Sequence, residues 1–265
     1  MNKFIILGVA RSGTSNLSAC LGNGILSEKI VQEPFLFTSG DRDHYSTLKN
    51  EQDKRTRGLL GNYYHESVWP KNCKDAFDFL DALYSNFTGI KHIITSSAAF
   101  LNRMIIEYAV RNNIKIIFQS RKSLLDCSIS DQLTDITGVI QWSKEGKSKV
   151  DNAKYQPIDL QKILSVADVW YSKIDQCKFW VRLYKPEVKY LRYEENFTDS
   201  LTKKLALISD LCEFIGISFS DLDYTWVKYH YLENKKLNTS KNLEKIPNYK
   251  EFLKLKEEYD TIFVG

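Results

Sequence analysis

The residues with the clearest chemical potential lie near the N-terminus, between an apolar segment and a helical pattern. Residues 8–15 read Gly-Val-Ala-Arg-Ser-Gly-Thr-Ser. A strand–loop–helix turn of this kind directs backbone N–H groups and the positive end of the helix toward an anion. Gly13 lets the backbone approach closely, and Thr14 and Ser15 add hydroxyl donors. The segment therefore predicts an anion-binding loop.

The same loop departs from the Walker pattern G-x-x-x-x-G-K-[ST] at its lysine. Thr14 stands in that place, and the cation of the loop is Arg11 instead. An enzyme that acts on nucleoside triphosphates needs this lysine to contact the β- and γ-phosphates, together with Mg²⁺. Arg11 suits a ligand with one 5′-phosphate and a terminal group that leaves without a metal. A kinase or other phosphotransferase stays an alternative, as does a turn that binds nothing.

Four short apolar segments predict the strands that must position this loop. They are rich in β-branched and aromatic residues and too short for core helices, and they span residues 3–9, 89–95, 114–120 and 188–193. Helical patterns follow at 98–112, 159–184 and 198–215. The alternation predicts an α/β fold, a parallel sheet flanked by helices on both faces, with P-loop-like architecture and a single domain over 1–265.

One stretch, residues 131–157, does not fit this alternation. It is polar, contains two glycines and carries a charge-rich run. We interpret it as an insertion in the domain, either a mobile lid over an acceptor or a solvated loop.

Composition limits the partners and the setting. The net charge is +4, and Lys and Arg are spread along 265 residues, whereas a nucleic-acid-binding domain usually carries a denser basic face. The five cysteines show no metal-ligand spacing and are expected to be mostly buried, reduced thiols. No apolar window is long enough for a membrane span. We expect a cytoplasmic protein that binds no nucleic acid.

Two segments resemble those of the PAPS-dependent sulfotransferase superfamily. Residues 11–15, Arg-Ser-Gly-Thr-Ser, resemble its 5′-phosphosulfate loop in the form of Golgi-type and bacterial members. Residues 116–130 are similar to its 3′-phosphate segment, in which a strand ends in a basic residue and a serine follows eight positions later. Lys122 and Ser130 have this spacing, and Arg121 lies one position earlier. The choice between the two cations for the 3′-phosphate stays open.

This resemblance implies transfer of a sulfuryl group from 3′-phosphoadenosine-5′-phosphosulfate (PAPS) to a hydroxyl group of a small acceptor, such as a carbohydrate or another metabolite. It implies that Glu33 is the base, that Lys91 contacts the sulfate or bridging oxygen and that Arg11 contacts the phosphosulfate bridge, with no metal. His92 is the second candidate base. Adjacent strand residues face opposite sides, so only one of Lys91 and His92 can reach the cofactor. Pro34 is expected to bias Glu33 toward an extended conformation.

The resemblance also implies a C-terminal segment that folds back over the nucleotide, with Lys236 and Ser240 as its contacts. A charged surface run explains this segment almost as well. The full set of implied cofactor-binding residues is Arg11, Ser12, Gly13, Thr14, Ser15, Arg121, Lys122, Ser130, Lys236 and Ser240. A nucleotide-binding module without catalysis is the remaining alternative.

Overall fold

The structure is a computed structural model that describes residues 3–22, 30–34, 73–95, 99–139, 144–196, 200–232 and 240–263. The prediction for Lys236 lies outside these residues. Ser240 is described as the first residue of the short helix α11 (Ser240–Leu243), and its side chain is not described.

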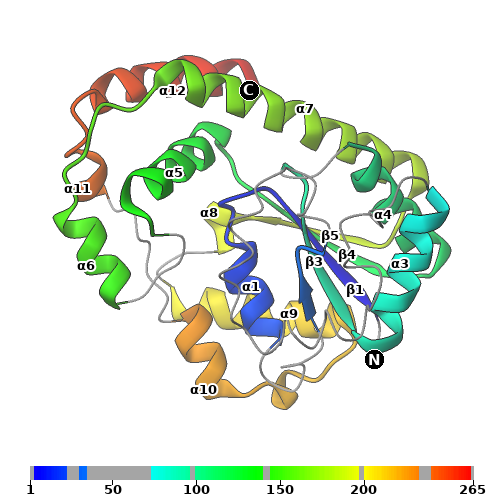
Figure 1. The fold of residues 1–265 in the computed structure, drawn as a ribbon. Helices are drawn as coiled ribbons and strands as arrows, with labels where there is room; N and C mark the ends of the chain where they lie inside the picture. The colour runs from blue at the N-terminus through cyan, green and yellow to red at the C-terminus, as the bar shows by residue number, and fades with distance from the viewer. Residues whose placement is uncertain are drawn as a thin grey trace.

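Five parallel strands form one sheet in the order β2-β3-β1-β4-β5 (Figure 1). Their bounds are β1 Phe4–Gly8, β2 Ile30–Gln32, β3 Gly89–Ile93, β4 Lys115–Ser120 and β5 Val188–Arg192. The four strands predicted from the sequence are confirmed, whereas β2 was not predicted because three residues give no periodic pattern. Since all strands are parallel, their carboxyl ends share one edge, where ligands bind in open α/β folds.

The side chains of β1 alternate between two cores, one on each face of the sheet. Ile5 and Leu7 pack into the larger core. Its helices are α3 (Cys73–Asn86), α4 (Ala99–Arg111), α5 (Leu124–Thr137), α7 (Leu160–Tyr184) and α12 (Tyr249–Phe263). Phe4 and Ile6 face the smaller core, which α1 (Thr14–Gly22) and α9 (Leu201–Ile215) cover (Figure 1). The predicted helices on both faces are confirmed.

The helix boundaries follow capping residues that the sequence displays. The Asp159 side chain accepts a hydrogen bond from the Lys162 amide at 2.9 Å and begins α7. Ser200 does the same for α9, which ends at Gly216 with a left-handed φ of 72°. Within the described residues, no helix combines the length and the apolar character needed to cross a membrane.

The cysteines are distributed between the two cores. Cys20 and Cys212 lie in the smaller core, and Cys127 and Cys177 lie in the larger one. Burial raises the pKa of Cys127 to about 12 and that of Cys212 to about 11, so both thiols are protonated near neutral pH. For these four side chains, the expectation of buried free thiols is confirmed.

The segment 131–157 is largely helical, which differs from the expectation of a solvated loop, while a role as a lid over an acceptor stays a prediction. Its first part continues α5 as far as Thr137, and its middle forms α6 (Lys144–Asn152). Gln132 is buried and exchanges two hydrogen bonds with the backbone of Asp159, at 3.0 and 3.2 Å. These tertiary contacts offset the poor helical signal of a polar sequence.

The C-terminal segment packs against the same region. Asp151 of α6 accepts a hydrogen bond from the Asn242 side chain at 2.9 Å, and its carbonyl oxygen accepts one from Lys245 at 2.6 Å. The Asn248 amide makes two 2.9 Å hydrogen bonds with the backbone of Ile158. The end of the chain is thereby joined to the segment between α5 and α7.

Candidate active site

The loop between β1 and α1 has the backbone geometry that an anion site requires. Gly13 has a φ of 83° and Arg11 a φ of 61°, both in the left-handed region. The helix α1 begins at Thr14, so the first N–H groups of the helix lie at the carboxyl edge of the sheet. A Cβ at Gly8 would lie 2.0 Å from Thr14 Cγ2, so a larger residue there would displace the Thr14 side chain. The predicted strand–loop–helix turn is therefore present.

The loop is anchored from the neighbouring strand by Gln119 of β4. The Gln119 amide donates a 2.9 Å hydrogen bond to the carbonyl oxygen of Ser12. Ser12 is fully buried, and its hydroxyl group donates to the Val9 carbonyl oxygen at 2.6 Å. The Ser12 side chain therefore stabilises the turn from within, and a ligand contact from this residue would come from its backbone.

The Lys91 ammonium group reaches the loop from β3, on the face that α1 covers. It donates a 2.8 Å hydrogen bond to the Ser15 hydroxyl group and forms an ion pair with Glu33 Oε1. The Lys91 side chain is 2% exposed and that of Glu33 is 24% exposed. An unpaired ammonium group at this depth would cost several kcal/mol, so Glu33 and Ser15 stabilise its charge. A buried cation, a carboxylate and a loop hydroxyl group thus meet at one point.

The backbone of Glu33 differs from the sequence-based expectation. Its φ is 51°, in the left-handed region, whereas the following Pro34 predicts an extended conformation. The Glu33 amide donates a 2.7 Å hydrogen bond to the Lys91 carbonyl oxygen, which continues the pairing of β2 with β3. Both the backbone and the side chain of Glu33 are therefore bonded to Lys91, and these two bonds offset the unfavourable φ.

Residues with a positive φ occur both at helix ends and in the candidate site. Among the described residues other than glycine, four have positive φ: Arg11, Glu33, Asn113 and Lys185. Lys185 caps the end of α7, and Asn113 follows the end of α4, where this conformation is common. Arg11 and Glu33 end no helix. Such conformations cost of order 1–3 kcal/mol and are concentrated at functional sites.

His92 lies on the opposite face of β3 from Lys91. Its Nε2 is 2.7 Å from Asn102 Oδ1 of α4, and the side chain is buried. Burial lowers the pKa of His92 to about 4, although the hydrogen bond to Asn102 and the nearby Glu33 carboxylate both act to raise it. The two side chains face opposite sides of β3, as expected for adjacent strand residues, and that only one of them reaches the cofactor stays a prediction. The second candidate base is a neutral core residue.

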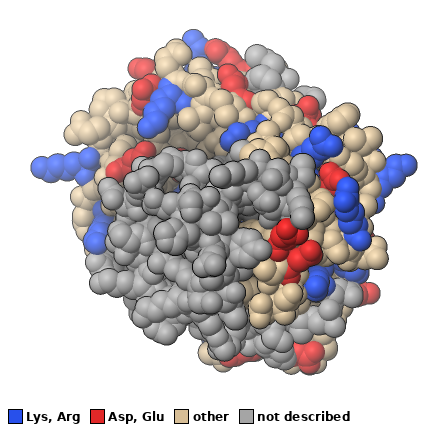
Figure 2. Space-filling model, turned by 45° about the vertical axis from the view of Figure 1, so that its right-hand side comes forward, with Lys and Arg blue, Asp and Glu red and all other residues tan. Residues whose placement is uncertain are grey.

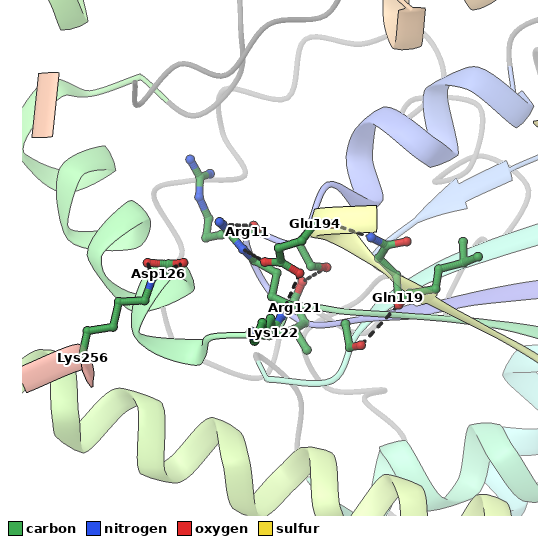
Figure 3. Close-up of polar contacts among 11 residues, drawn as sticks. Arg11, Gln119, Arg121, Lys122, Asp126, Glu194 and Lys256 are labelled. Carbon is green, nitrogen blue, oxygen red and sulfur yellow. Dashed lines mark hydrogen bonds and ion pairs between the residues drawn. The ribbon is translucent and has the colours of Figure 1, made fainter. Parts of the chain in front are cut away.

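Arg121 follows β4 and is bound by the protein itself. Its Nε pairs with Glu194 Oε1 at 3.3 Å, and its Nη1 donates to the Arg11 carbonyl oxygen at 3.1 Å (Figure 3). The guanidinium carbon lies 4.4 Å from the centre of the Tyr193 ring. Burial acts to lower the pKa of Arg121, but nearby acidic groups, Glu194 among them, outweigh it and the pKa is raised.

Lys122 and Ser130 have different surroundings. The Lys122 amide donates to Glu194 Oε2 at 2.9 Å, and the residue is exposed. The Ser130 hydroxyl group accepts a 3.3 Å hydrogen bond from Arg11 Nε, so the two predicted anion segments touch through these side chains. Burial lowers the pKa of Arg11, and the nearby Asp131 carboxylate acts to raise it. The expectation that Arg11 contacts a phosphosulfate bridge stays a prediction.

A cavity opens beside Lys122 on the α7 side of the sheet edge. Four cationic side chains line it, together with aromatic, apolar and polar side chains and one carboxylate; its residues are Ser120, Arg121, Lys122, Leu124, Tyr171, Ile174, Asp175, Lys178, Arg192 and Tyr259. The exposed Lys122 ammonium group is therefore accessible from solvent at the carboxyl edge.

Sequence reasoning missed two residues that organise the site, Gln119 and Glu194. Gln119 gives no sequence signal beyond its place at the end of a strand. Glu194 lies two residues after β5 ends, and a carboxylate near the carboxyl end of a parallel strand is a signal that could have marked it.

Charges of both signs are mixed on the described part of the surface shown in Figure 2. On the face shown in Figure 2, Lys and Arg side chains are scattered among acidic ones around the described surface. They form no continuous basic patch on the described part of this face.

The fold and the loop define a P-loop-like α/β protein. No protein-family model matches the chain, and no curated protein sequence matches it. A search of solved structures matches a sulfotransferase domain from the curacin biosynthetic pathway, with 12% identity over 91% of this chain and 82% of that domain and a TM-score of 0.45. It also matches a sulfotransferase domain from the Synechococcus PCC 7002 olefin synthase, with 14% identity over 97% and 94% and a TM-score of 0.42. At these identities and scores, the activity of the chain has to be argued from its own residues.

Proposed function

We propose that this protein is a sulfotransferase that moves a sulfuryl group from PAPS to a hydroxyl group of a small acceptor. The observation that carries the proposal is the Lys91 ammonium group, buried between the Ser15 hydroxyl group of an anion loop and the Glu33 carboxylate. These are the three kinds of group that sulfuryl transfer requires: an anion cradle, a cation at the reacting end and a base.

The reacting end is assigned to Glu33 and Lys91. PAPS supplies an activated sulfuryl group, whose bond to the bridging oxygen breaks as the acceptor oxygen bonds to sulfur. Glu33 accepts the proton of the acceptor hydroxyl group, and its 24% exposure leaves it accessible to an acceptor. Lys91 stabilises the negative charge that grows on the bridging oxygen, which stays with the 5′-phosphate of the product, adenosine 3′,5′-bisphosphate.

The nucleotide end is assigned to the loop and to the segment after β4. The backbone of residues 12–15 would hold the 5′-phosphate, and Ser130 and Lys122 would hold the 3′-phosphate. The contact between Arg11 and Ser130 supports this grouping, as does the exposure of Lys122. We keep a contact of Arg11 with the bridge, and contacts from Lys236 and Ser240, as parts of the same proposal.

The acceptor is proposed only by class. A hydroxyl-bearing carbohydrate or other small metabolite fits the proposal, because the acceptor needs one proton that Glu33 can remove. The residues that would select the acceptor belong to loops, which vary independently of the fold.

Two alternatives lead to different results in a binding experiment. In isothermal titration calorimetry, a sulfotransferase binds adenosine 3′,5′-bisphosphate without a metal, and a phosphotransferase binds ATP in the presence of Mg²⁺ in preference. Binding of MgATP with no heat from the bisphosphate would overturn the proposal. A binding module without catalysis would bind the bisphosphate but would turn over no acceptor in a panel of sugars and phenols supplied with radiolabelled PAPS.

The base is tested by Glu33→Gln, which keeps the shape of the side chain and removes its basicity. We expect turnover to fall by roughly 10²- to 10⁴-fold, because this is the usual contribution of a positioned base, while bisphosphate affinity changes little. The matched control is Glu187→Gln, since Glu187 also pairs with a lysine, Lys115, at 2.9 Å, but immediately before β5 at the opposite edge of the sheet. Equal turnover in the two variants would contradict the role of Glu33.

A further inference from the structure

One carboxylate, that of Glu194, connects three separate segments at the edge of the sheet. It lies in α8 (Tyr193–Asn196), directly after β5. Its Oε1 pairs with Arg121 Nε at 3.3 Å and its Oε2 accepts from the Lys122 amide at 2.9 Å. Arg121 in turn donates to the Arg11 carbonyl oxygen at 3.1 Å (Figure 3). The ends of β5 and β4 and the anion loop are thereby joined.

The loop needs such support because of its backbone conformation. Arg11 has a φ of 61°, which is unfavourable for a residue with a Cβ. A hydrogen bond to its carbonyl oxygen fixes the orientation of the following peptide, which leads into the turn at Gly13 and the start of α1. A donor held at this point therefore favours the loop geometry in the absence of any ligand.

Arg121 is itself held rigidly enough to act as this donor. Its side chain is 15% exposed, and the Tyr193 ring covers the guanidinium group at 4.4 Å. The planar guanidinium group presents Nε to Glu194 and Nη1 to the Arg11 carbonyl oxygen at the same time, a fixed geometry that the single ammonium nitrogen of a lysine does not provide. An isolated exposed ion pair contributes little, but a network in which both carboxylate oxygens are used can contribute more.

We propose that Glu194 is a positioning residue that acts through Arg121 to set the anion loop for the 5′-phosphate of the nucleotide. This inference rests on the proposed function. It assigns Arg121 to the loop rather than to the 3′-phosphate, and it assigns Glu194 an indirect function in ligand binding.

The two possible roles of Arg121 are separated by comparing two nucleotides. Adenosine 3′,5′-bisphosphate and adenosine 5′-monophosphate share the 5′-phosphate and differ in the 3′-phosphate. If Arg121 positions the loop, Arg121→Gln weakens the binding of both nucleotides by the same factor. We expect this factor to be roughly tenfold or more, as for lost charged hydrogen bonds. If Arg121 binds the 3′-phosphate directly, the variant weakens the bisphosphate alone, and the proposal is overturned.

Glu194→Gln completes the calorimetric test. It should reproduce the loss seen for Arg121→Gln on both nucleotides, and the double variant should lose no more than Arg121→Gln alone, because both changes break one link. The matched control is Glu195→Gln, since Glu195 lies on the same short helix, is 64% exposed and pairs with Arg192 at 3.6 Å. Unchanged affinities in Glu194→Gln, or equal losses in the Glu195→Gln control, would overturn the proposal.

Hydrogen exchange of the ligand-free protein separates this proposal from the proposed function. The amides of residues 11–15 should exchange faster in Glu194→Gln than in the wild type, while those of β1 stay unchanged. Unchanged loop exchange would overturn the positioning role. A wild-type protein that binds neither nucleotide would overturn the proposed function, and the exchange result would still decide whether Glu194 orders the loop.

Discussion

Lys91 and Arg121 are two shielded cations at the same edge of the sheet, but they differ in what surrounds them. The Lys91 ammonium group faces the Ser15 hydroxyl group and the Glu33 carboxylate. Arg121 is bonded to Glu194 and to the Arg11 carbonyl oxygen, and Tyr193 covers its guanidinium group. The partners of Lys91 are groups that a reaction can use, whereas those of Arg121 are parts of the framework.

On the proposed roles of these two residues, a basic residue in an anion motif need not bind the anion. A cation that shapes the loop and a cation that touches the ligand have the same sequence signature, a basic residue after a strand. Only the contacts of the side chain distinguish them. The comparison predicts effects of different kinds for changes at Lys91, at its neighbour His92 and at Lys122.

The largest effect is expected at Lys91. Lys91→Met removes the cation from the reacting end and leaves Glu33 without its partner, so we expect turnover to fall by roughly 10²- to 10³-fold, as for loss of one transition-state donor. Radiolabelled PAPS with an active acceptor measures this. Lys115→Met is the control, because Lys115 is also a sheet lysine, bonded to the Phe214 carbonyl oxygen at 2.7 Å and remote from the loop. If the Lys91→Met variant were as active as this control, Lys91 would not act in the reaction, and the proposed difference between Lys91 and Arg121 would be wrong.

The adjacent His92 should make the stability of the folded protein depend on pH. Its folded pKa of about 4 lies below the unfolded value of 6.5, so the unfolded chain binds more protons between these values. Stability contributed by neutral His92 is complete above about pH 6.5 and is lost as the pH falls toward 4, which amounts to about 2 kcal/mol between pH 7 and pH 5. His92→Gln should flatten this dependence in urea unfolding measured at the two pH values.

Two outcomes would contradict this account of His92. An unchanged pH dependence in His92→Gln would show that the histidine does not titrate as its burial requires. A loss of turnover at pH 7 as large as that of Glu33→Gln would return His92 to the role of base and would bring both faces of β3 into the site.

A smaller effect is expected at Lys122. Lys122→Met should weaken the binding of adenosine 3′,5′-bisphosphate by about tenfold, as for loss of one charged hydrogen bond. The binding of adenosine 5′-monophosphate should weaken much less. Lys203→Met controls for the loss of one positive charge, because Lys203 is exposed on α9. If Lys122→Met weakens both nucleotides equally, Lys122 acts on the loop as Arg121 does, and the contrast between the two cations disappears.

The sequence predicted most of the fold because its signals are local. Four strands, the capped helices α7 and α9 and the glycine loop depend on apolar runs, capping residues and turn residues that act over a few positions. The short β2 strand and the helices within 131–157 were missed because tertiary contacts stabilise them. Gln132 is an example, since its bonds to Asp159 span 27 positions.

The candidate site was also predicted only in part. The residue types at Arg11, Lys91 and Glu33 were recognisable, but their contacts join residues far apart in the chain: 58 positions separate Lys91 from Glu33, and 119 separate Arg11 from Ser130. The prediction of an extended conformation for Glu33 was wrong, since its φ is left-handed. The local preference of a residue before proline is weaker than the two bonds that Glu33 makes to Lys91.

The alternation of strands and helices and the glycine loop after the first strand could be predicted from the sequence, since backbone preference and hydrophobic periodicity act along the chain. Three contacts depend on the tertiary structure: Lys91, and not His92, faces the loop, Glu33 pairs with Lys91, and Arg121 is bonded both to Glu194 and to the Arg11 carbonyl oxygen. The physical reason is that the direction and charge state of a side chain depend on what packs around it, and those neighbours come from distant parts of the sequence.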